Sequence, residues 1–362
     1  MGARMAGFNG WDMPVEYPAT GGIMAEHMAV RTVAGLFDVS HMGDILIESS
    51  GQRGSALAAV QHMSMNDASQ LAVGQAQYSA LLYPQGTFVD DVLVHRTGEE
   101  EYLLVINAGT REKDLQWVRQ NAAGFPCAVR DLSDAYVQLA IQGPCAAELL
   151  QTLSDANLGG IKKYHFAWGR VCEVPRVMIA RTGYSGEDGF ELYLPSDAAV
   201  AGTVWNRLLE SGKTLGLLPC GLGARNTLRL EVCMALYGHE ISDTINVWEA
   251  RLERFCRMDK GDFSGRAALK RARAAGLRRV LAGLEMLDRG IARDNYSVFD
   301  QAGGQIGYVT SGSPAPFLKK NIALAYLPPE HAAIGQIVYV EVRGQRLKAQ
   351  VVPRPFYKRP RR

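Results

Sequence analysis

The chain has 362 residues, more than a single hydrophobic core usually supports, so two or three packed units are expected. Hydrophobic residues make up 47% of it and charged residues 21%, proportions that exclude both disorder throughout and a membrane-embedded protein. Lys and Arg number 39 against 37 Asp and Glu, and a net charge of +2 gives no global field that would indicate nucleic acid or membrane as a partner.

The predicted elements in the middle of the chain alternate between strands and helices. Residues 92–97 and 102–108 flank the polar turn GEEE, which predicts a hairpin with Asp90 and Asp91 at its mouth. A helix is expected at 111–124, a strand at 136–143, a helix at 143–153, a strand at 177–180, a helix at 204–212, and a second amphipathic helix after LPCGLG. This alternation is typical of α+β or α/β layers.

After about Gly261 the pattern changes. The basic stretch GRAALKRARAAGLRR predicts a helix, and six short strand-like segments follow it, separated by Gly, Asp and Pro. These segments are VLAGLEM, SVFD, GQIGYVTSG, NIALAYL, IVYVEVRG and LKAQVVP. Their spacing predicts a small β-barrel or sandwich at roughly 275–357, with a domain boundary on or just before the basic helix.

The cysteines and the first residues give an expectation for the cellular compartment of the protein. Six cysteines are scattered without a C-x-x-C pair or a histidine at zinc-finger spacing, which predicts reduced thiols. The opening MGARMAGFNGWDMP has the features of neither a signal peptide nor a transit peptide. Apolar runs such as 322–327 are too short to span a bilayer. We therefore expect a cytoplasmic enzyme or binding protein, or one of the mitochondrial matrix if the source is eukaryotic.

Two glycine-rich motifs are candidates for ligand binding. LPCGLGARNTLRLE lacks the spacing of a phosphate loop or a dinucleotide fingerprint, although Arg225 could clamp a carboxylate or phosphate. RTGYSGEDGFELYL follows an apolar strand, and a carboxylate in it could accept two N–H groups from a planar heterocycle such as pterin or guanine. An ordinary helix-surface ion pair and a solvated acidic turn fit the same patterns about as well.

Acidic and histidine residues elsewhere give little sign of metal chemistry. Asp90 and Asp91 are adjacent, so on a strand their side chains point to opposite faces and cannot form a close acid/base pair or share a metal. The seven histidines show no metal-binding spacing, and His41 is interpreted as a packing or hydrogen-bonding residue.

Nine motifs occur in one order along the chain: GFNGWDMPVEY, VAGLFDVSHMGD, YLLVINAGTREKD, IQGPCA, RTGYSGEDGFELY, PCGLGARNTLRLE, KGDFSGRAAL, GYVTSGSPAP and RPFYKR. Through them the chain resembles the aminomethyltransferases of the glycine cleavage system, the T-protein family, over essentially its whole length. The resemblance implies an α+β fold with three lobes in a cloverleaf, in which two α+β folate-binding lobes and a C-terminal β-barrel surround a central channel. The folate-binding domain would cover 1–265 and the barrel domain 275–362.

The resemblance also implies roles for seven residues of this sequence. Asp91 would be the catalytic carboxylate, and Glu191 would hold the pterin with Tyr184 beside it. Four further residues would line the folate cavity or contact the folate: Met42, Tyr78, Asn107 and Arg225.

The implied reaction moves the one-carbon unit of an aminomethyl-lipoyl carrier, the lipoylated H-protein, to tetrahydrofolate. Tetrahydrofolate is then a co-substrate, and no metal, flavin, nucleic acid or membrane is expected to take part. Two alternatives stay open, a folate-dependent demethylase of the same fold and a non-enzymatic folate-binding regulator; retention of Asp91 argues against the regulator. Nine basic residues in two segments could dock the carrier: Lys270, Arg271, Arg273, Arg278, Arg279, Lys358, Arg359, Arg361 and Arg362. A solvated helix face and a loose tail explain them about as well.

Four positions depart from the family pattern. Asn226 stands where aspartate is usual, Asn246 where proline is usual, Arg251 where glycine is usual and Arg254 where tryptophan is usual. Three of these lie within nine residues of one another, and the loss of an aromatic residue and gain of two arginines there could alter the lobe interface or the channel wall.

Overall fold

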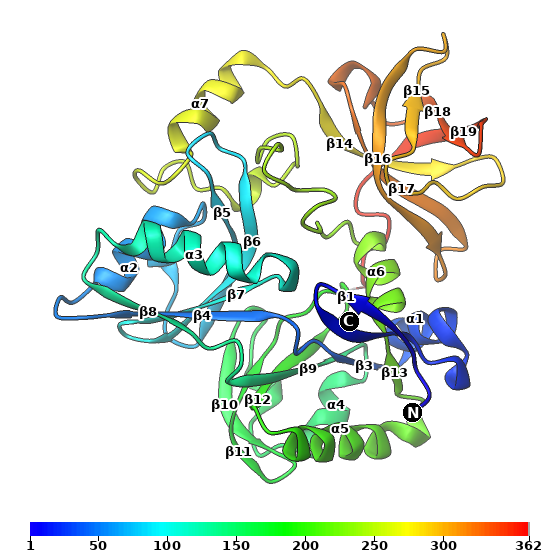
Figure 1. Ribbon diagram of the computed structural model, residues 1–362. Coiled ribbons are helices and arrows are strands. Elements are labelled where there is room, and N and C mark those ends of the chain that lie inside the picture. The colour runs from blue at the N-terminus through cyan, green and yellow to red at the C-terminus, as the bar shows by residue number, and fades with distance from the viewer. Residues whose placement is uncertain (361–362) are drawn as a thin grey trace. The chain divides into compact units, whose positions relative to one another are not determined.

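Figure 1 shows the computed structural model, which describes residues 1–360. The chain divides into two compact units. Unit 1 comprises Met1–Leu81, Asp90–Arg225 and Asp259–Phe263, and unit 2 comprises Leu82–Val89, Asn226–Met258 and Ser264–Arg362.

A five-stranded sheet belongs mainly to unit 1 and has the order β5, β6, β7, β4, β8. Its strands are β4 (Gly43–Ser49), β5 (Gln75–Leu82), β6 (Phe88–Gly98), β7 (Glu101–Ile106) and β8 (Cys127–Asp131). Helices α2 (Ser55–Met63) and α3 (Arg111–Ala122) contact the sheet and each other. The hairpin expected at 92–97 and 102–108 is confirmed as β6 and β7, which pair antiparallel.

A six-stranded sheet lies entirely in unit 1 and has the order β10, β11, β12, β9, β3, β13. Its strands are β3 (Gly35–Asp38), β9 (Tyr136–Gln142), β10 (Phe166–Val171), β11 (Val174–Ala180), β12 (Gly189–Pro195) and β13 (Leu218–Cys220). Helices α4 (Ala146–Gln151) and α5 (Ala198–Gly212) contact β9 and β12. The expected strands at 136–143 and 177–180 and the helices at 143–153 and 204–212 are therefore present.

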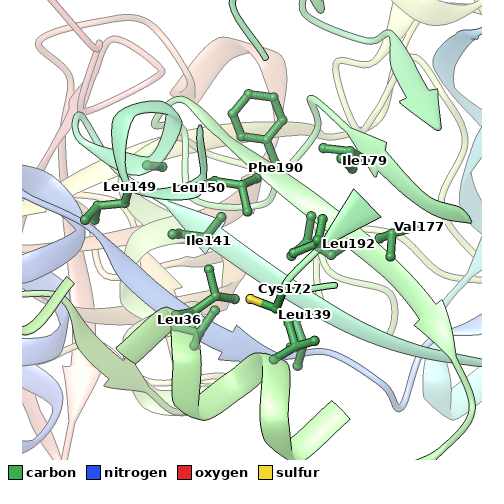
Figure 2. Packing of buried hydrophobic residues seen from close by; sticks show 14 of the residues in the cluster. Leu36, Leu139, Ile141, Leu149, Leu150, Cys172, Val177, Ile179, Phe190 and Leu192 are labelled. Carbon is green, nitrogen blue, oxygen red and sulfur yellow. The ribbon is translucent and has the colours of Figure 1, made fainter. Parts of the chain in front are cut away.

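The two faces of this sheet have different neighbours because strand side chains alternate. Leu139 and Ile141 of β9 and Phe190 and Leu192 of β12 enter the hydrophobic core beneath the helices, as Figure 2 shows. The residues between them, such as Glu191, point to the opposite face. The alternation thus buries one face in the core and leaves the other face for a site.

The remaining elements of unit 1 surround these sheets. Strands β1 (Arg4–Phe8) and β2 (Trp11–Glu16) form an antiparallel hairpin, and α1 (Gly22–Thr32) contacts β2, β3 and β13. Short 3-10 helices occur along the whole chain: η1 (Pro18–Thr20), η2 (Ala68–Gln70), η3 (Ala108–Thr110), η4 (Leu158–Gly160), η5 (Lys213–Leu215), η6 (Glu253–Phe255) and η7 (Pro329–His331).

Unit 2 contains a closed barrel with the strand order β14, β17, β16, β15, β18, β19. Its strands are β14 (Val280–Met286), β15 (Ser297–Phe299), β16 (Gln305–Ala315), β17 (Lys320–Leu327), β18 (Ile337–Val342) and β19 (Gln345–Val352). All six predicted segments are strands, and pairing of β14 with β19 closes the barrel, so the sandwich alternative is wrong. The basic helix is α7 (Arg266–Ala275), and the helix after LPCGLG is α6 (Leu222–Glu231).

The α+β class and the C-terminal barrel are confirmed, whereas the cloverleaf around a channel and the boundaries 1–265 and 275–362 stay predictions. None of the six cysteines, all of which lie in the described residues, forms a disulfide. Within residues 1–360 no helix has the length and apolar character needed to cross a membrane.

Candidate functional site

Asp91 lies on β6 with both carboxylate oxygens hydrogen-bonded. Its Oδ2 accepts from the Tyr78 hydroxyl at 3.0 Å, and its Oδ1 accepts from the Asn107 side-chain amide at 2.9 Å. Tyr78 belongs to β5, and Asn107 directly follows β7. Three neighbouring strands therefore bring together three of the predicted site residues.

The register of β6 and β7 explains the position of Asn107. Leu93 lies opposite Val105, and continuing this antiparallel register by two residues places Asn107 opposite Asp91. Directly opposed residues have Cβ atoms about 4.5–5.5 Å apart, within reach of a side-chain amide. Pairing of the two strands thus determines the donor that Asp91 receives.

Asp90 and Asp91 are expected on opposite faces of the strand, where they cannot form a close acid/base pair or share a metal, yet they share a hydrogen-bonding partner. Asp90 is fully buried and Asp91 half-buried, yet both carboxylates lie 2.9 Å from the same atom, Asn107 Nδ2. The reason is that Asn107 lies beyond the paired part of the two strands, where its NH₂ group can give one hydrogen to each carboxylate. The two acids are neighbours around one amide.

The environment of Asp91 changes its acidity. Burial, followed by the nearby charge of Asp90, raises the pKa of Asp91 to about 7, although hydrogen bonds from Tyr78 and Asn107 act in the opposite direction. Burial and Asp91 in turn raise the pKa of Tyr78 well above its usual value, so its hydroxyl keeps its proton and remains a donor. A carboxyl group with a pKa near neutrality is suited to general acid–base catalysis.

Glu191 lies on β12, on the face away from the hydrophobic core. Its Oε2 accepts a hydrogen bond from the Thr182 hydroxyl, the single side-chain donor that it has among residues 1–360. Burial raises the pKa of Glu191, whereas Thr182 and the nearby Arg225 lower it. A carboxylate with one bonded oxygen keeps acceptor positions for an incoming N–H group.

A hollow of about 290 Å³, counting the space open to solvent at its mouth, lies beside Glu191. Apolar and aromatic side chains form most of its wall, and a few polar groups converge on it, as in many small-molecule sites. Its lining residues are Phe37, Val39, Ala140, Gln142, Tyr184, Ser185, Glu191 and Arg225. Three of the predicted site residues, Tyr184, Glu191 and Arg225, are brought together here.

Arg225 and Tyr184 form a stacked pair in this hollow, with the guanidinium 4.5 Å from the ring centroid. Arg225 lies in the first turn of α6, and its N–H donates to the Gly221 carbonyl at 3.1 Å. A Cβ atom at Gly221 would lie 2.4 Å from the carbonyl oxygen of Val15. The glycine therefore allows a close backbone approach that puts Arg225 in place.

Asp91, with Tyr78 and Asn107, belongs to the five-stranded sheet, and the hollow beside Glu191 belongs to the six-stranded sheet. These two sheets pack on one another. One hydrophobic cluster joins strands of both sheets: Leu103, Val105, Phe166, Met178, Ala180 and Tyr193. Across the same contact, the Gln138 amide of β9 donates to the buried Asp44 carboxyl of β4 at 2.5 Å. The sheets are thus tied together close to both parts of the site.

Tyr78 and Tyr184 link the two parts of the site electrostatically, since Tyr184 contributes to the raised pKa of Tyr78.

Met42, also predicted to line the folate cavity, lies away from the hollow. It lies in the turn between β3 and β4 and packs, partly buried, against the hydrophobic cluster that joins the sheets. It is not among the residues that line the hollow.

Several residues of RTGYSGEDGFELYL have structural partners. Arg181 binds both oxygens of Asp188, at 3.0 and 2.5 Å, and Glu187 forms a buried ion pair with Arg31 at 2.9 Å. These charges hold the loop, which leaves Tyr184 and Glu191 for the hollow.

His41 behaves as the packing residue that its sequence context predicts. It is 1% exposed and lies edge-on to Phe8, with ring centroids 5.5 Å apart. Burial, aided by Arg225, lowers the pKa of His41 to about 3, so it is neutral at physiological pH.

Two further residues, which no motif indicated, orient the predicted ones. Thr182 donates to Glu191, and Gln142 lines the hollow while its amide donates to the Thr182 carbonyl at 3.0 Å. A Cβ atom at Gly183 or Gly189 would lie 2.0 or 2.7 Å from the Gln142 side chain. These two glycines of the RTGYSGEDGFELYL motif therefore make room for Gln142, and they are the signal in the sequence that could have pointed to it.

The four departures from the family pattern lie in unit 2, Asn226 within α6 and the other three in or next to local turns. Asn246 Oδ1 accepts from the N–H groups of Trp248 and Glu249, both at 3.0 Å, and Asn226 Oδ1 accepts from Arg229 at 2.9 Å. The Arg254 guanidinium lies 4.5 Å from the centroid of the Phe255 ring. Arg251 has a φ of 57°, in the left-handed region that favours glycine.

Comparison with known families gives two matches along the chain. Residues 1–260 match the family model described as GCVT N-terminal domain, and residues 279–358 match the one described as glycine cleavage T-protein C-terminal barrel domain.

Individual proteins are similar over nearly the whole chain. An aminomethyltransferase of Acidobacterium capsulatum is 61% identical over 363 residues, covering 100% of this chain and 94% of that protein. One from Koribacter versatilis is 60% identical over 361 residues, covering 100% and 94%. The crystal structure of the glycine cleavage system aminomethyltransferase T from Bartonella henselae superposes with a TM-score of 0.89 at 34% identity, covering 99% of this chain and 95% of that one.

Proposed function

The chain belongs to the glycine cleavage T-protein family, and from this premise we propose that it transfers the one-carbon unit of an aminomethyl-lipoyl carrier protein to tetrahydrofolate. Its relatives are aminomethyltransferases, and it is accordingly a transferase. The observation that carries the proposal is the Asp91 carboxylate, bonded on both oxygens and with a pKa of about 7.

The proposed reaction balances without an added oxidant or reductant. The two folate nitrogens N5 and N10 each form a bond to the carbon and lose a proton. The carbon loses its bonds to sulfur and to the amine nitrogen, and the two protons end on the thiol and on ammonia. The products are 5,10-methylenetetrahydrofolate, ammonia and the dihydrolipoyl carrier.

Asp91 is proposed to act where positive charge develops on nitrogen. A fixed carboxylate stabilises such a charge and can accept a proton from a folate nitrogen, effects worth about 10²- to 10⁴-fold in rate. The hydrogen bonds from Tyr78 and Asn107 hold the carboxylate in one orientation before substrate arrives. The chain thus supplies a preorganised charge instead of one that must be ordered during the reaction.

Tetrahydrofolate suits the hollow beside Glu191. The pterin edge presents neighbouring N–H donors, and Glu191 has acceptor positions that Thr182 does not occupy. Phe37, Val39 and Ala140 offer an apolar wall to a planar ring. We propose that Tyr184 and Arg225 contact the folate from the same hollow.

The partner is proposed to be the lipoylated H-protein, docked through basic residues of unit 2. Lys270, Arg271 and Arg278 are exposed, whereas Arg273 lies over the Trp248 ring at 5.4 Å and Arg279 pairs with Glu249 at 3.0 Å. In the chain's last segment Lys358 and Arg359 are also exposed, and Arg361 and Arg362 lie outside the described residues. Docking through exposed charges should weaken as salt rises.

A cytoplasmic location is part of the proposal. Its support is the presence of six cysteines that form no disulfide, since reduced thiols are the rule in that compartment.

The test is a turnover assay with tetrahydrofolate and aminomethylated lipoyl carrier protein, following both ammonia and methylenetetrahydrofolate. Equal amounts of the two products, formed only when both substrates are present, are expected. Folate binding without turnover would support the regulator, and transfer of a methyl group from a small sulfonium substrate would support the demethylase. Either result would overturn the proposal.

A further inference from the structure

A network of hydrogen bonds surrounds the fully buried carboxylate of Asp90, next to Asp91. Its Oδ1 accepts from Asn107 Nδ2 at 2.9 Å and from the Asp91 N–H at 3.0 Å. Its Oδ2 accepts from the Thr110 hydroxyl at 2.6 Å and from the Asn107 N–H at 3.3 Å. Four donors therefore converge on this one carboxylate, and three of them belong to Asp91 and Asn107.

A second buried acid, Asp114 of α3, belongs to the surroundings of Asp90. Its side chain is fully buried, and burial, followed by Asp90, raises the pKa of Asp114 to about 10, while Lys113 and Thr110 lower it. The hydrogen bond that holds Asp90 from this side of the network comes from the Thr110 hydroxyl.

This network fixes the orientation of the Asn107 amide. If the amide were flipped, its oxygen would face the carboxylates of both Asp90 and Asp91, with two acceptors opposed to a third. With Nδ2 bonded to Asp90, its second hydrogen can reach Asp91 Oδ1. The position of the Asp91 carboxylate thus depends on a residue that does not face the substrate.

We propose that Asp90 is a positioning residue for Asp91: the Thr110 hydroxyl holds Asp90, and Asp90 aims the Asn107 amide at the reacting carboxylate. The inference rests on the proposed catalytic role of Asp91.

The first test compares two variants of Thr110 that differ in hydrogen-bonding ability. Thr110→Val keeps the branched shape and removes the hydroxyl that donates to Asp90, and we expect kcat to fall about 10- to 100-fold, the scale of a small misplacement of a catalytic group. Thr110→Ser keeps the hydroxyl and should retain most of the turnover. Both variants are checked for folding by thermal unfolding, and KM for tetrahydrofolate should stay within about twofold because Thr110 does not line the hollow.

The second test uses the pH profile of kcat for Asp90→Asn. Removing the charge of Asp90 takes away a contribution that raises the pKa of Asp91, so the acid limb should move to lower pH. The amide would also place an N–H group against the Asn107 N–H, so the plateau should fall. The other titratable groups that face this network are Lys113, Tyr78 and Tyr184, and all three remain in the variant.

Three outcomes separate the inference from the proposed function. An acid limb at lower pH for Asp90→Asn, together with retained turnover of Thr110→Ser, supports the positioning role of Asp90. An unmoved limb, or equal turnover of Thr110→Val and the unaltered chain, overturns it. Full activity of Asp91→Asn would instead overturn the proposed function, whatever the other variants do.

Discussion

Asp91 and Glu191 are both carboxylates on strands of unit 1, but their hydrogen bonds and neighbouring charges differ. Asp91 receives a donor on each oxygen, from Tyr78 and Asn107. Glu191 receives one side-chain donor, Thr182, on a single oxygen. Asp91 is adjacent to a second buried acid, whereas Glu191 lies near the cation Arg225.

The difference indicates a division of roles. A carboxylate with both oxygens bonded is fixed in place and gains from a raised pKa, which suits proton transfer. A carboxylate with open acceptor positions can satisfy the donors of a ligand, which suits binding. The comparison predicts that changes at Asp91 act on the rate of the chemical step and that changes at Glu191 act on affinity.

Among the tests that leave Asp91 itself unaltered, the first and largest expected effect is on the pH dependence of turnover. Because burial and Asp90 raise the pKa of Asp91 to about 7, the ionised form is lost as pH falls through that value. We expect kcat to be level above about pH 8 and to fall about tenfold per pH unit below pH 7, or roughly 100-fold by pH 5. A kcat that stayed level down to pH 5 would show that Asp91 ionisation does not limit the reaction.

A change at Glu191 should act on binding instead. Glu191→Gln leaves one acceptor oxygen and places an NH₂ group against ligand donors, and a donor left unpaired costs about 1–3 kcal/mol. The Kd for tetrahydrofolate should rise roughly 5- to 150-fold in calorimetry. The matched control is Glu210→Gln, an exposed acid on α5 that does not line the hollow, and its Kd should stay close to that of the unaltered chain.

A third buried carboxyl group, that of Asp44, is expected to act on the free energy of unfolding rather than on rate or affinity. Burial raises the pKa of Asp44 to about 8, and the Gln138 hydrogen bond only partly offsets this. The folded state then binds a proton more tightly than the unfolded state, so the contribution of Asp44 to stability is present at low pH and is lost as pH rises from about 4 to 8.

Asp44→Asn should remove this dependence. Relative to the unaltered chain, the free energy of unfolding of the variant should increase by up to about 1.4 kcal/mol per pH unit over that window. Urea unfolding at pH 5, 6, 7 and 8 measures it. Parallel pH curves for the two proteins would mean that Asp44 is ionised in both states.

The smallest effect is expected outside the site, at the departure Arg251. A residue other than glycine in the left-handed region costs about 1–2 kcal/mol. Glycine removes this cost, but its greater freedom in the unfolded chain offsets part of the gain in stability. Arg251→Gly should therefore raise the free energy of unfolding by about 1 kcal/mol without changing kcat. Arg254→Gly, in the 3-10 helix η6, is the control and should lower stability.

Much of the fold could be predicted from the sequence where local pattern decides the structure. The six barrel strands and the hairpin of β6 and β7 coincide with their predicted segments within a few residues. Closure of the barrel could not be predicted, because the contact of β14 with β19 joins segments about 60 residues apart and leaves no local pattern.

The site could be predicted in part, and through the family resemblance rather than through spacing. The structure brings together Asp91, Tyr78 and Asn107 in one group and Tyr184, Glu191 and Arg225 in another. The residues that orient them were missed, because Thr110 and Thr182 act through tertiary contacts with residues of strands. No periodicity in the sequence records such contacts.

The measurement that tests the account most directly is the single-turnover rate of Asp91→Asn saturated with tetrahydrofolate, since single turnover separates chemistry from binding and release. The amide keeps the shape of the side chain and loses its charge, so we predict a rate about 10²- to 10⁴-fold below that of the unaltered chain, with the Kd for folate nearly the same. Asp134→Asn, an exposed acid of unit 1, is the control and should keep the full rate. An unchanged single-turnover rate in Asp91→Asn, or a loss that higher folate concentrations restore, would contradict the catalytic role of Asp91.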